Sequence, residues 1–342
     1  MSLSRRTLIR LGGASLAAAA VGGGVGFQRW RKTGGLSSMR ITGPWPELGP
    51  QVNWILPDLD NAHMEVPDRP HDMEETRDPQ RRAAVKRTRA FTVSSSSRRL
   101  RGDNFGPLPP DGVKRIVAIG DSTTFGWGVA DDETWPALLQ EELTRRGHQV
   151  EVLNAGVPAQ ALEGMVAWLR TVGPTMGLHG VLFTRRPPPA GGDPLHAYAQ
   201  AVANVRRALP SARVHVLLSA ISQFDPHGMQ VWQIEDSGLR ARITDTPVFD
   251  MTPSIRAAQG SRGCRIELAG QTIRVVRGET GETLLTAAAS QHGLPREVYT
   301  LLEKDASVRE ALFFDDGHLD ADGYAIMAPI VADELATAGW FS

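Results

Sequence analysis

Short apolar runs alternate with amphipathic helical patterns from residue 113 onward, and this alternation limits the fold more than any other feature. Lys114–Gly120 has the pattern of a buried strand, and Thr134–Arg146 places its apolar residues on one helical face. The order repeats, with strands at Val150–Asn154, Gly180–Thr184 and Arg213–Ala220 and helices at Leu162–Val172 and Pro194–Leu209. Such alternation favours right-handed crossovers and a parallel sheet covered on both faces. We predict a three-layer α/β/α domain with a central parallel sheet over residues 111–342.

The alternation stops after Gln223, and a helical pattern returns only from Leu284. We interpret residues 224–283 as an insertion into the domain, ahead of the final helix. Within it, Leu239–Phe249 and Arg265–Val276 have the pattern of short hairpins.

The final helix is predicted over Ala321–Ala338, with Asp320 as its N-cap and Gly339 as its stop. The pattern does not show where a fifth strand of the sheet would lie.

The first 35 residues have the features of an export signal. Arg5 and Arg6 precede a weakly apolar stretch that runs to about Phe27, which resembles a twin-arginine signal. An ordinary secretory signal and a retained membrane anchor are the alternatives, and the sequence leaves them open. Each predicts export to the periplasm or beyond, with the N-terminus as a possible membrane attachment, and the first implies the Tat translocase as a partner.

Residues 36–110 show no sustained apolar period, so we expect a loop-rich lead-in to the domain. An acidic segment, Asp58–Asp78, is followed by a basic, serine-rich one, Arg81–Arg101. Their adjacency favours mutual neutralisation over a patch for an anionic ligand.

Overall composition argues against nucleic-acid binding and against a fold held by cysteines. Lys and Arg total 37 against 38 Asp and Glu, a net charge of −1, so no global field would hold nucleic acid. The single cysteine, Cys264, excludes an intrachain disulfide and a cysteine-rich zinc site.

Ser122 follows the first strand directly, in Gly120-Asp121-Ser122, and precedes a helix. Parallel α/β sheets bind ligands at the carboxyl ends of their strands, which is where this turn lies. A serine there can expose its hydroxyl, and its own N–H points toward an oxyanion formed on that hydroxyl. Taken alone, a serine after a strand more often only caps a helix.

Asp315 precedes His318 by three residues in a short loop before the last helix. This spacing lets the carboxylate fix the imidazole tautomer while the other ring nitrogen takes a proton from a serine. No metal site is predicted, because the neighbouring acids Asp316, Asp320 and Asp322 have no histidine at ligand spacing. No phosphate loop or dinucleotide fingerprint occurs, so no cofactor is predicted.

Gly120-Asp121-Ser122, Asn154-Ala155-Gly156 and Asp315-x-x-His318 together resemble the motifs of the GDSL, or SGNH, hydrolase superfamily of serine esterases and lipases. The resemblance implies a flavodoxin-like fold, with Ser122 as nucleophile, His318 as base and Asp315 as the acid that orients it. It also implies that the N–H groups of Ser122 and Gly156 donate to the oxyanion.

The segment ahead of the first strand, with its Arg99–Gly102, is similar to the segment found there in many members of the superfamily. One departure concerns the asparagine that the superfamily carries after its third strand. Here that strand is followed by Arg185, Arg186 and prolines, with no asparagine. Losing one oxyanion donor costs about 100- to 1000-fold in rate. Either arginine could supply the donor, or both could simply be exposed; the sequence leaves this open.

We therefore expect an exported serine esterase that hydrolyses a carboxylic ester through an acyl-enzyme. Its substrate would be a small molecule, an acylated or acetylated carbohydrate, or a lipid ester. The absent asparagine leaves two alternatives. One is a degenerate protein that binds an acylated glycan or envelope component without turnover. The other is an acyltransferase in which a sugar hydroxyl replaces water.

Overall fold

A computed structural model gives the fold of the chain. It describes residues 63–66, 91–96, 98, 100–158, 160–184, 186, 193–222, 238–259, 264–268, 271–277, 283–288, 308–313 and 318–342. The export signal predicted in residues 1–35 lies outside these residues, as does most of the lead-in. Within the described part, no helix is long and apolar enough to cross a membrane.

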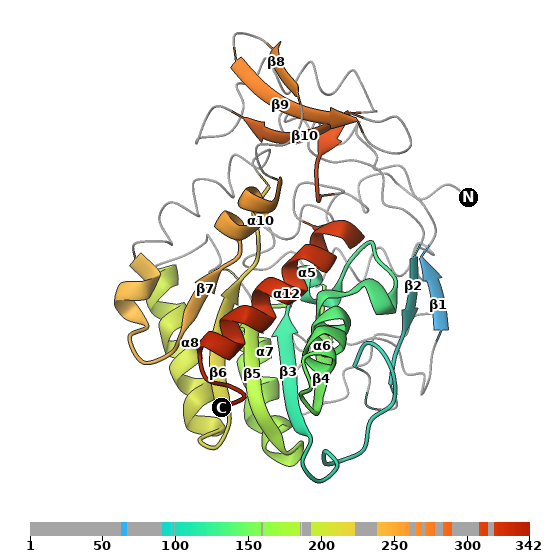
Figure 1. Cartoon of the computed structure of the whole chain (residues 1–342). Coiled ribbons are helices and arrows are strands. Elements are labelled where there is room, and N and C mark those ends of the chain that lie inside the picture. The colour runs from blue at the N-terminus through green and yellow to red at the C-terminus, as the bar shows by residue number, and fades with distance from the viewer. Residues whose placement is uncertain are drawn as a thin grey trace, which may run out of the picture.

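A five-stranded parallel sheet of order β4-β3-β5-β6-β7 forms the centre of the molecule, as Figure 1 shows. Its strands are β3 (Lys114–Gly120), β4 (Val150–Gly156), β5 (Leu178–Thr184), β6 (Arg213–Leu218) and β7 (Val248–Asp250). The helices are α5 (Ser122–Phe125), α6 (Trp135–Arg145), α7 (Leu162–Thr171), α8 (Pro194–Ala208), α10 (Thr252–Gln259) and α12 (Ala321–Thr337), with short 3-10 turns η3 (Asp131–Glu133) and η4 (Gly173–Thr175). This arrangement confirms the predicted three-layer α/β/α fold.

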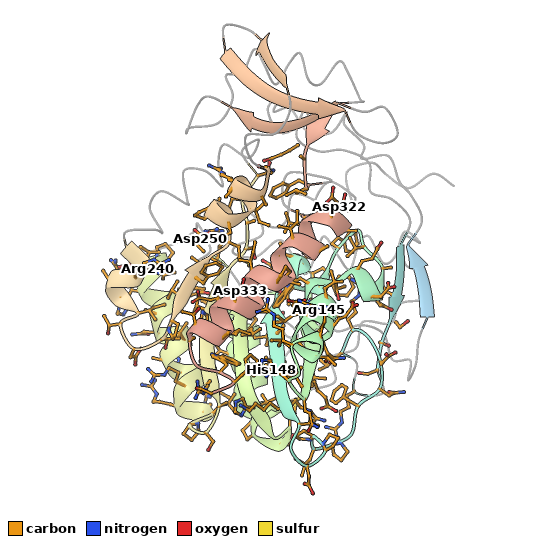
Figure 2. All side chains as sticks on the ribbon, viewed as in Figure 1. Arg145, His148, Arg240, Asp250, Asp322 and Asp333 are labelled. Atoms are coloured by element: carbon orange, nitrogen blue, oxygen red, sulfur yellow. The ribbon has the colours of Figure 1, made fainter. Side chains whose placement is uncertain are left out.

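The two faces of β3 have separate cores. Ile116 and Ala118 pack with apolar side chains of α6 and α12, and Val117 and Ile119 pack with those of α7 and α8. All four are buried, and removing such a side chain from water contributes about 1.5–3 kcal/mol for residues of the size of Val or Ile. On the outer surface α6 and α12 lie side by side, where Asp333 accepts from Arg146 at 2.6 Å (Figure 2).

The fifth strand, β7, lies where the sequence predicted a hairpin at Leu239–Phe249, and that prediction is wrong. Residues 238–242 are helical, and β7 pairs in parallel with β6. A strand of three residues is too short to produce a recognisable period.

A second sheet, of order β11-β10-β9-β8, lies beyond the carboxyl ends of the main strands in Figure 1. The predicted hairpin is confirmed, because β8 (Cys264–Leu268) and β9 (Gln271–Arg277) pair antiparallel. The helix predicted from Leu284 is wrong, because β10 (Thr283–Ala288) is a strand that pairs with β9 and with β11 (Val308–Glu310). The inserted sheet therefore continues past residue 283.

The predicted final helix is confirmed as α12. Asp320 caps it, with Oδ1 accepting the N–H of Gly323 at 2.9 Å, and Gly339 follows its end at a φ of 71°. Only glycine adopts this left-handed conformation without steric cost.

The last part of the lead-in belongs to the fold. β1 (His63–Val66) pairs antiparallel with β2 (Phe91–Ser94), and the chain then attaches to β4. There the N–H of Arg101 donates to the carbonyl of Asn154 at 3.1 Å. Residues ahead of the predicted boundary at residue 111 thus contact the domain.

His215 of β6 is fully buried beneath α12 and Trp340. Its Nε2 lies 3.2 Å from Oε1 of Glu334 but without the geometry of a hydrogen bond. Burial lowers the pKa of His215 from 6.5 to about 4, and burial raises the pKa of Glu334. Near neutral pH His215 is therefore uncharged, and the contact is not an ion pair.

We expect the free energy of unfolding to fall as the pH is lowered from about 6.5 to about 4. In this window the unfolded chain binds a proton at His215 that the folded chain does not, which costs on the order of 3 kcal/mol at the acid end. Urea unfolding at several pH values measures the effect. His215→Leu should flatten the dependence, and an unchanged slope in that variant would assign the acid sensitivity to other groups.

Candidate active site

Ser122 is the first residue of α5, which begins directly after β3. Asp121 is the N-cap, and its Oδ1 accepts from the N–H of Thr123 at 3.1 Å and from the Thr123 hydroxyl at 2.9 Å. The first N–H groups of a helix have no acceptor within the helix. The N–H of Ser122 is therefore placed to donate to a negatively charged oxygen.

Two glycines at strand ends let α5 approach the sheet. A Cβ on Gly156 would overlap the backbone of Phe125, and a Cβ on Gly120 would overlap the side chains of Thr124 and Thr184. The backbone contact cannot be relieved by a change of rotamer. The short helix thus lies directly against the carboxyl ends of β3 and β4.

The structure brings Ser122 and His318 together. Nε2 of His318 lies 2.8 Å from Oγ of Ser122, although the residues are 196 positions apart in the sequence. Ser122 is 6% exposed and His318 is 2% exposed, so water has little access to the hydrogen bond between them. This is the geometry in which an imidazole can take the proton of a serine hydroxyl. Asp315, predicted to orient the histidine, lies outside the described residues.

His318 lies shortly before α12, and the residues that follow it contact residues 312 and 313. Phe313 and Leu319 form an antiparallel bridge, and the N–H of Asp320 donates to the carbonyl of Leu312 at 3.0 Å. Leu312 has a φ of 70°, a left-handed conformation that is rare for a residue with a branched side chain. The contacts of Leu319 and Asp320 therefore fix the backbone next to His318.

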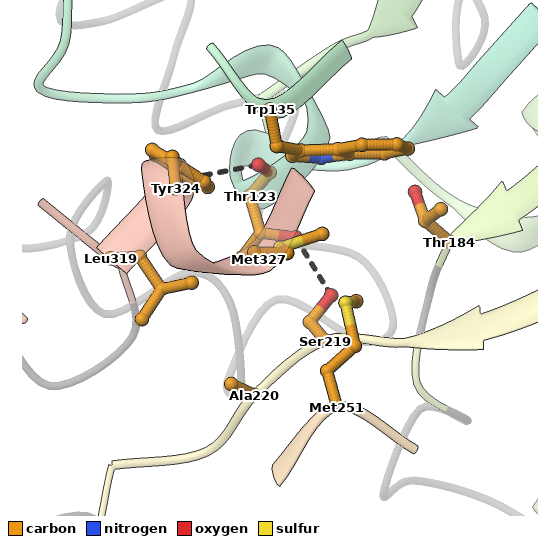
Figure 3. A pocket seen from close by; sticks show the side chains of 9 residues that line it. All are labelled: Thr123, Trp135, Thr184, Ser219, Ala220, Met251, Leu319, Tyr324 and Met327. Atoms are coloured by element: carbon orange, nitrogen blue, oxygen red, sulfur yellow. Dashed lines mark hydrogen bonds between the residues drawn. The ribbon is translucent and has the colours of Figure 1, made fainter. Parts of the chain in front are cut away.

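Tyr324 links the helix that follows the histidine to the helix that carries the serine. Its hydroxyl donates to the carbonyl of Thr123 at 2.9 Å, as Figure 3 shows. The tyrosine is 1% exposed, so this hydrogen bond is shielded from water. The sequence could not reveal it, because the partner is a backbone carbonyl 201 residues away.

Residues next to the pair in the sequence help to line a mostly apolar pocket, whose side chains Figure 3 shows. Its lining includes Thr123 and Leu319, the residues that directly follow Ser122 and His318. The hydroxyls of Thr123 and Ser219 lie 2.9 Å apart at its edge. The full lining is Thr123, Trp135, Thr184, Ser219, Ala220, Met251, Leu319, Tyr324 and Met327. Among the described residues, no three His, Cys, Asp or Glu side chains gather in a way that could hold a metal ion.

The N–H of Gly156 has an acceptor within the chain, and its donation to an oxyanion stays a prediction. Its N–H, expected to donate to an oxyanion, donates to Oδ1 of Asn154 at 3.0 Å. The Asn154 side chain turns along the end of β4, and its Nδ2 donates to the carbonyl of Phe125 at 3.3 Å. Gly156 therefore leaves space for α5. Asn154 hydrogen-bonds α5 to β4, a role that the motif did not predict.

Of the two sequence alternatives for Arg186, simple exposure is wrong, and donation to an oxyanion stays a prediction. Its Nε donates to the carbonyl of Ser219, and its Nη2 donates to Asp250 and Thr252, each at 2.7 Å. Its side chain is 13% exposed and that of Asp250 is 5% exposed. The ion pair joins the carboxyl ends of β5, β6 and β7, near the Asp250 label in Figure 2. Arg185 lies outside the described residues.

Residues 118–326 match the profile of the GDSL-like lipase/acylhydrolase family. The chain belongs to this family. GDSL-family proteins are hydrolases that act on ester bonds, so the match agrees with the function expected from the motifs. No curated protein matches this GDSL-family chain.

Solved structures of several hydrolases are similar to this GDSL-family chain. A lipase/acylhydrolase from Enterococcus faecalis is 15% identical, with a TM-score of 0.42 over 65% of this chain and 95% of that one. A GDSL-like lipase from Bacteroides thetaiotaomicron is 13% identical, with a TM-score of 0.37 over 68% and 93%. A two-domain esterase active on acetylated mannans is 14% identical, with a TM-score of 0.43 over 66% of this chain and 49% of that one.

Replacing Tyr324 by Phe should loosen the link between α12 and α5 without leaving a void. We expect a loss of about 1 kcal/mol in the free energy of unfolding, since one buried hydrogen bond is removed. We also expect lower turnover of an ester, because the distance between Ser122 and His318 becomes less fixed. Urea unfolding and ester hydrolysis measure the two effects. Tyr198→Phe, a buried tyrosine on α8 at the other face of the sheet, is the control. Equal loss of turnover in both variants would contradict a specific role for Tyr324.

Proposed function

We propose that the chain is a serine esterase in which Ser122 is the nucleophile and His318 the general base. The hydrogen bond of 2.8 Å between Oγ of Ser122 and Nε2 of His318 carries the proposal. Family membership, which rests on residues 118–326, supports it independently of that distance.

In the first half of the reaction, Oγ of Ser122 attacks the ester carbonyl while its proton passes to Nε2 of His318. A bond forms between Oγ and the carbonyl carbon, and the carbonyl oxygen becomes negative. When this intermediate collapses, the bond to the alcohol oxygen breaks and the imidazolium returns the proton to the leaving alcohol. In the second half, water repeats the attack with His318 as base, which releases the acid and restores Ser122.

Asp315 is proposed to hold the other ring nitrogen of His318, as its spacing in the sequence suggests. The carboxylate would fix the tautomer in which Nε2 is free to accept the serine proton, and it would stabilise the imidazolium.

The oxyanion site of this esterase has fewer free hydrogen-bond donors than the superfamily motifs imply. The N–H of Ser122 is available as a donor, but that of Gly156 donates to Asn154, and the superfamily asparagine is absent. Each missing donor costs about 100- to 1000-fold in rate. This specific deficit favours, as a second candidate, a protein that binds an acylated glycan or envelope component without turnover. An acyltransferase would use the same serine and histidine, with a sugar hydroxyl in place of water.

We expect Ser122→Ala and His318→Ala each to reduce ester hydrolysis about 1000-fold or more, and the double variant to lose little beyond either. The two side chains act in one proton transfer, so removing the second adds little once the first is gone. Release of p-nitrophenol from short and long acyl esters measures turnover and also shows which acyl length is preferred. Thr175→Ala is the control, because its hydroxyl donates to the carbonyl of Val172 at 2.8 Å within η4, near the amino end of β5.

A fluorophosphonate probe separates the esterase from the binding protein. Phosphonylation at Ser122, located by mass spectrometry, supports an activated serine. A wild-type protein that neither reacts with the probe nor hydrolyses any ester would favour binding without turnover. Losses in the two single variants that multiply in the double variant would contradict a shared proton transfer.

We infer that the enzyme is exported by the twin-arginine route, which rests on Arg5 and Arg6 ahead of a weakly apolar stretch. Replacing both by Lys should leave the protein in the cytoplasm, since the pair is what such a signal presents to the Tat translocase. Cell fractionation measures the distribution. Arg10→Lys, in the same segment, is the control. Normal export of the double variant would favour an ordinary secretory signal.

A further inference from the structure

Arg101 lies beneath the end of α5, and its side chain is 1% exposed. Nη1 donates to the carbonyl of Phe125 at 2.5 Å and to that of Gly126 at 2.7 Å. Nη2 donates to the carbonyl of Val129 at 2.7 Å. One guanidinium thus binds three backbone carbonyls of the segment that follows Ser122.

The guanidinium is itself fixed from two sides. Its Nε donates to Oδ1 of Asp131 at 2.7 Å, and Oδ2 of Asp131 accepts the N–H of Ser94 at 2.7 Å. Its Cζ lies 4.6 Å from the centre of the Phe125 ring, within the range of a cation–π contact. A buried charge is tolerated only when it is paired and hydrogen-bonded, and these contacts meet that condition.

The segment that receives these hydrogen bonds cannot hold its position by itself. The last carbonyls of a helix have no donor within the helix, and α5 has only four residues. Isolated helices shorter than about 12 residues are marginal in water. Arg101 supplies a donor to the last carbonyl of α5, that of Phe125, and to two carbonyls that follow the helix. Its backbone N–H donates to the carbonyl of Asn154, so it also ties α5 to β4.

We propose that Arg101 is a positioning residue that fixes the nucleophile turn, so that Oγ and the N–H of Ser122 keep their places relative to His318. The inference rests on the esterase function proposed above and deepens it. Arg101 precedes residues 118–326, the part of the chain that matches the family profile, and comes from the lead-in. The lead-in is therefore part of the catalytic unit.

Arg115 is a matched control within the same molecule. Its side chain is 0% exposed, its Nε donates to Glu151 at 2.7 Å, and its Nη1 donates to the carbonyls of Pro107 at 3.1 Å and Met176 at 3.0 Å. It also lies over an aromatic ring. It is the second residue of β3, at the opposite end of the strand from Ser122. Arg115 is thus as buried as Arg101 and also contacts a carboxylate, two carbonyls and an aromatic ring, but it lies away from the nucleophile.

The experiment compares Arg101→Lys with Arg115→Lys in the full chain. Lys keeps the charge but cannot bond several carbonyls in the fork geometry of Arg. Fluorophosphonate titration counts the folded, reactive sites, and kcat and KM for p-nitrophenyl acetate are expressed per site. We expect Arg101→Lys to lower kcat and the phosphonylation rate about 10- to 100-fold with KM changed less than about 2-fold, because misplacement of a reacting group by about 1 Å has effects of this size. Arg115→Lys should leave kcat per site unchanged.

Asp131→Asn provides a second variant, which keeps Arg101 but weakens the contact that orients it. A smaller loss of kcat per site in the same direction is expected. If Arg101→Lys fails to fold, Asp131→Asn decides: a reduced kcat per site supports the proposal and an unchanged one overturns it.

Two other outcomes are distinguishable. A wild type that hydrolyses esters, with equal kcat per site in the Arg101 and Arg115 variants, would overturn the positioning role and leave the esterase intact. A wild type that neither turns over nor reacts with the probe would overturn the esterase and the positioning role with it.

Discussion

A four-residue helix has too few internal hydrogen bonds to be stable alone, and the candidate active site is built on one, α5. Its position depends on groups that reach it from elsewhere in the fold. Asp121 caps its start, Arg101 binds the carbonyls at its end, and Tyr324 donates to a carbonyl within it. Gly156 leaves room for it against β4. The distance between Ser122 and His318 is therefore a property of the whole domain rather than of the two segments that carry them.

The sequence predicted the strands β3 to β6 because each is buried on both faces, which produces a continuous apolar run between helical patterns. The prediction from sequence was wrong where the helix propensity of a segment disagrees with its pairing in a sheet. Leu284, Leu285, Ala287 and Ala288 are good helix formers, yet β10 pairs with β9 and β11, and those hydrogen bonds decide its conformation. The strand β7 was missed for another reason, since three residues are too few to show the alternation of a strand or the periodicity of a helix.

The meeting of Ser122 and His318 could be predicted because both follow fixed points of the fold, the end of β3 and the start of α12. The hydrogen-bond partners of the polar side chains could not be predicted from the sequence. Arg186 bonds Asp250, which lies at the end of β7, the one strand of the main sheet that the sequence did not reveal. The N–H of Gly156 donates to the side chain of Asn154, two residues earlier, and sequence spacing does not specify the rotamer that makes this possible. The motifs thus predicted which side chains meet, and only the structure shows their hydrogen bonds.

The contacts of Arg101 link the lead-in to the hydrolase domain. Without Arg101 the carbonyl of Phe125 would keep Nδ2 of Asn154 as a donor and that of Gly126 would keep the N–H of Val129, but the carbonyl of Val129 would lose its donor. A buried carbonyl without a partner costs about 1–3 kcal/mol. That loss is a sizeable share of the stability of a typical domain, about 5–15 kcal/mol. β2 supplies the N–H of Ser94 to Asp131, which in turn orients Arg101. The residues that hold the turn after Ser122 therefore extend back to β2, ahead of residue 111, where the sequence placed the start of the domain.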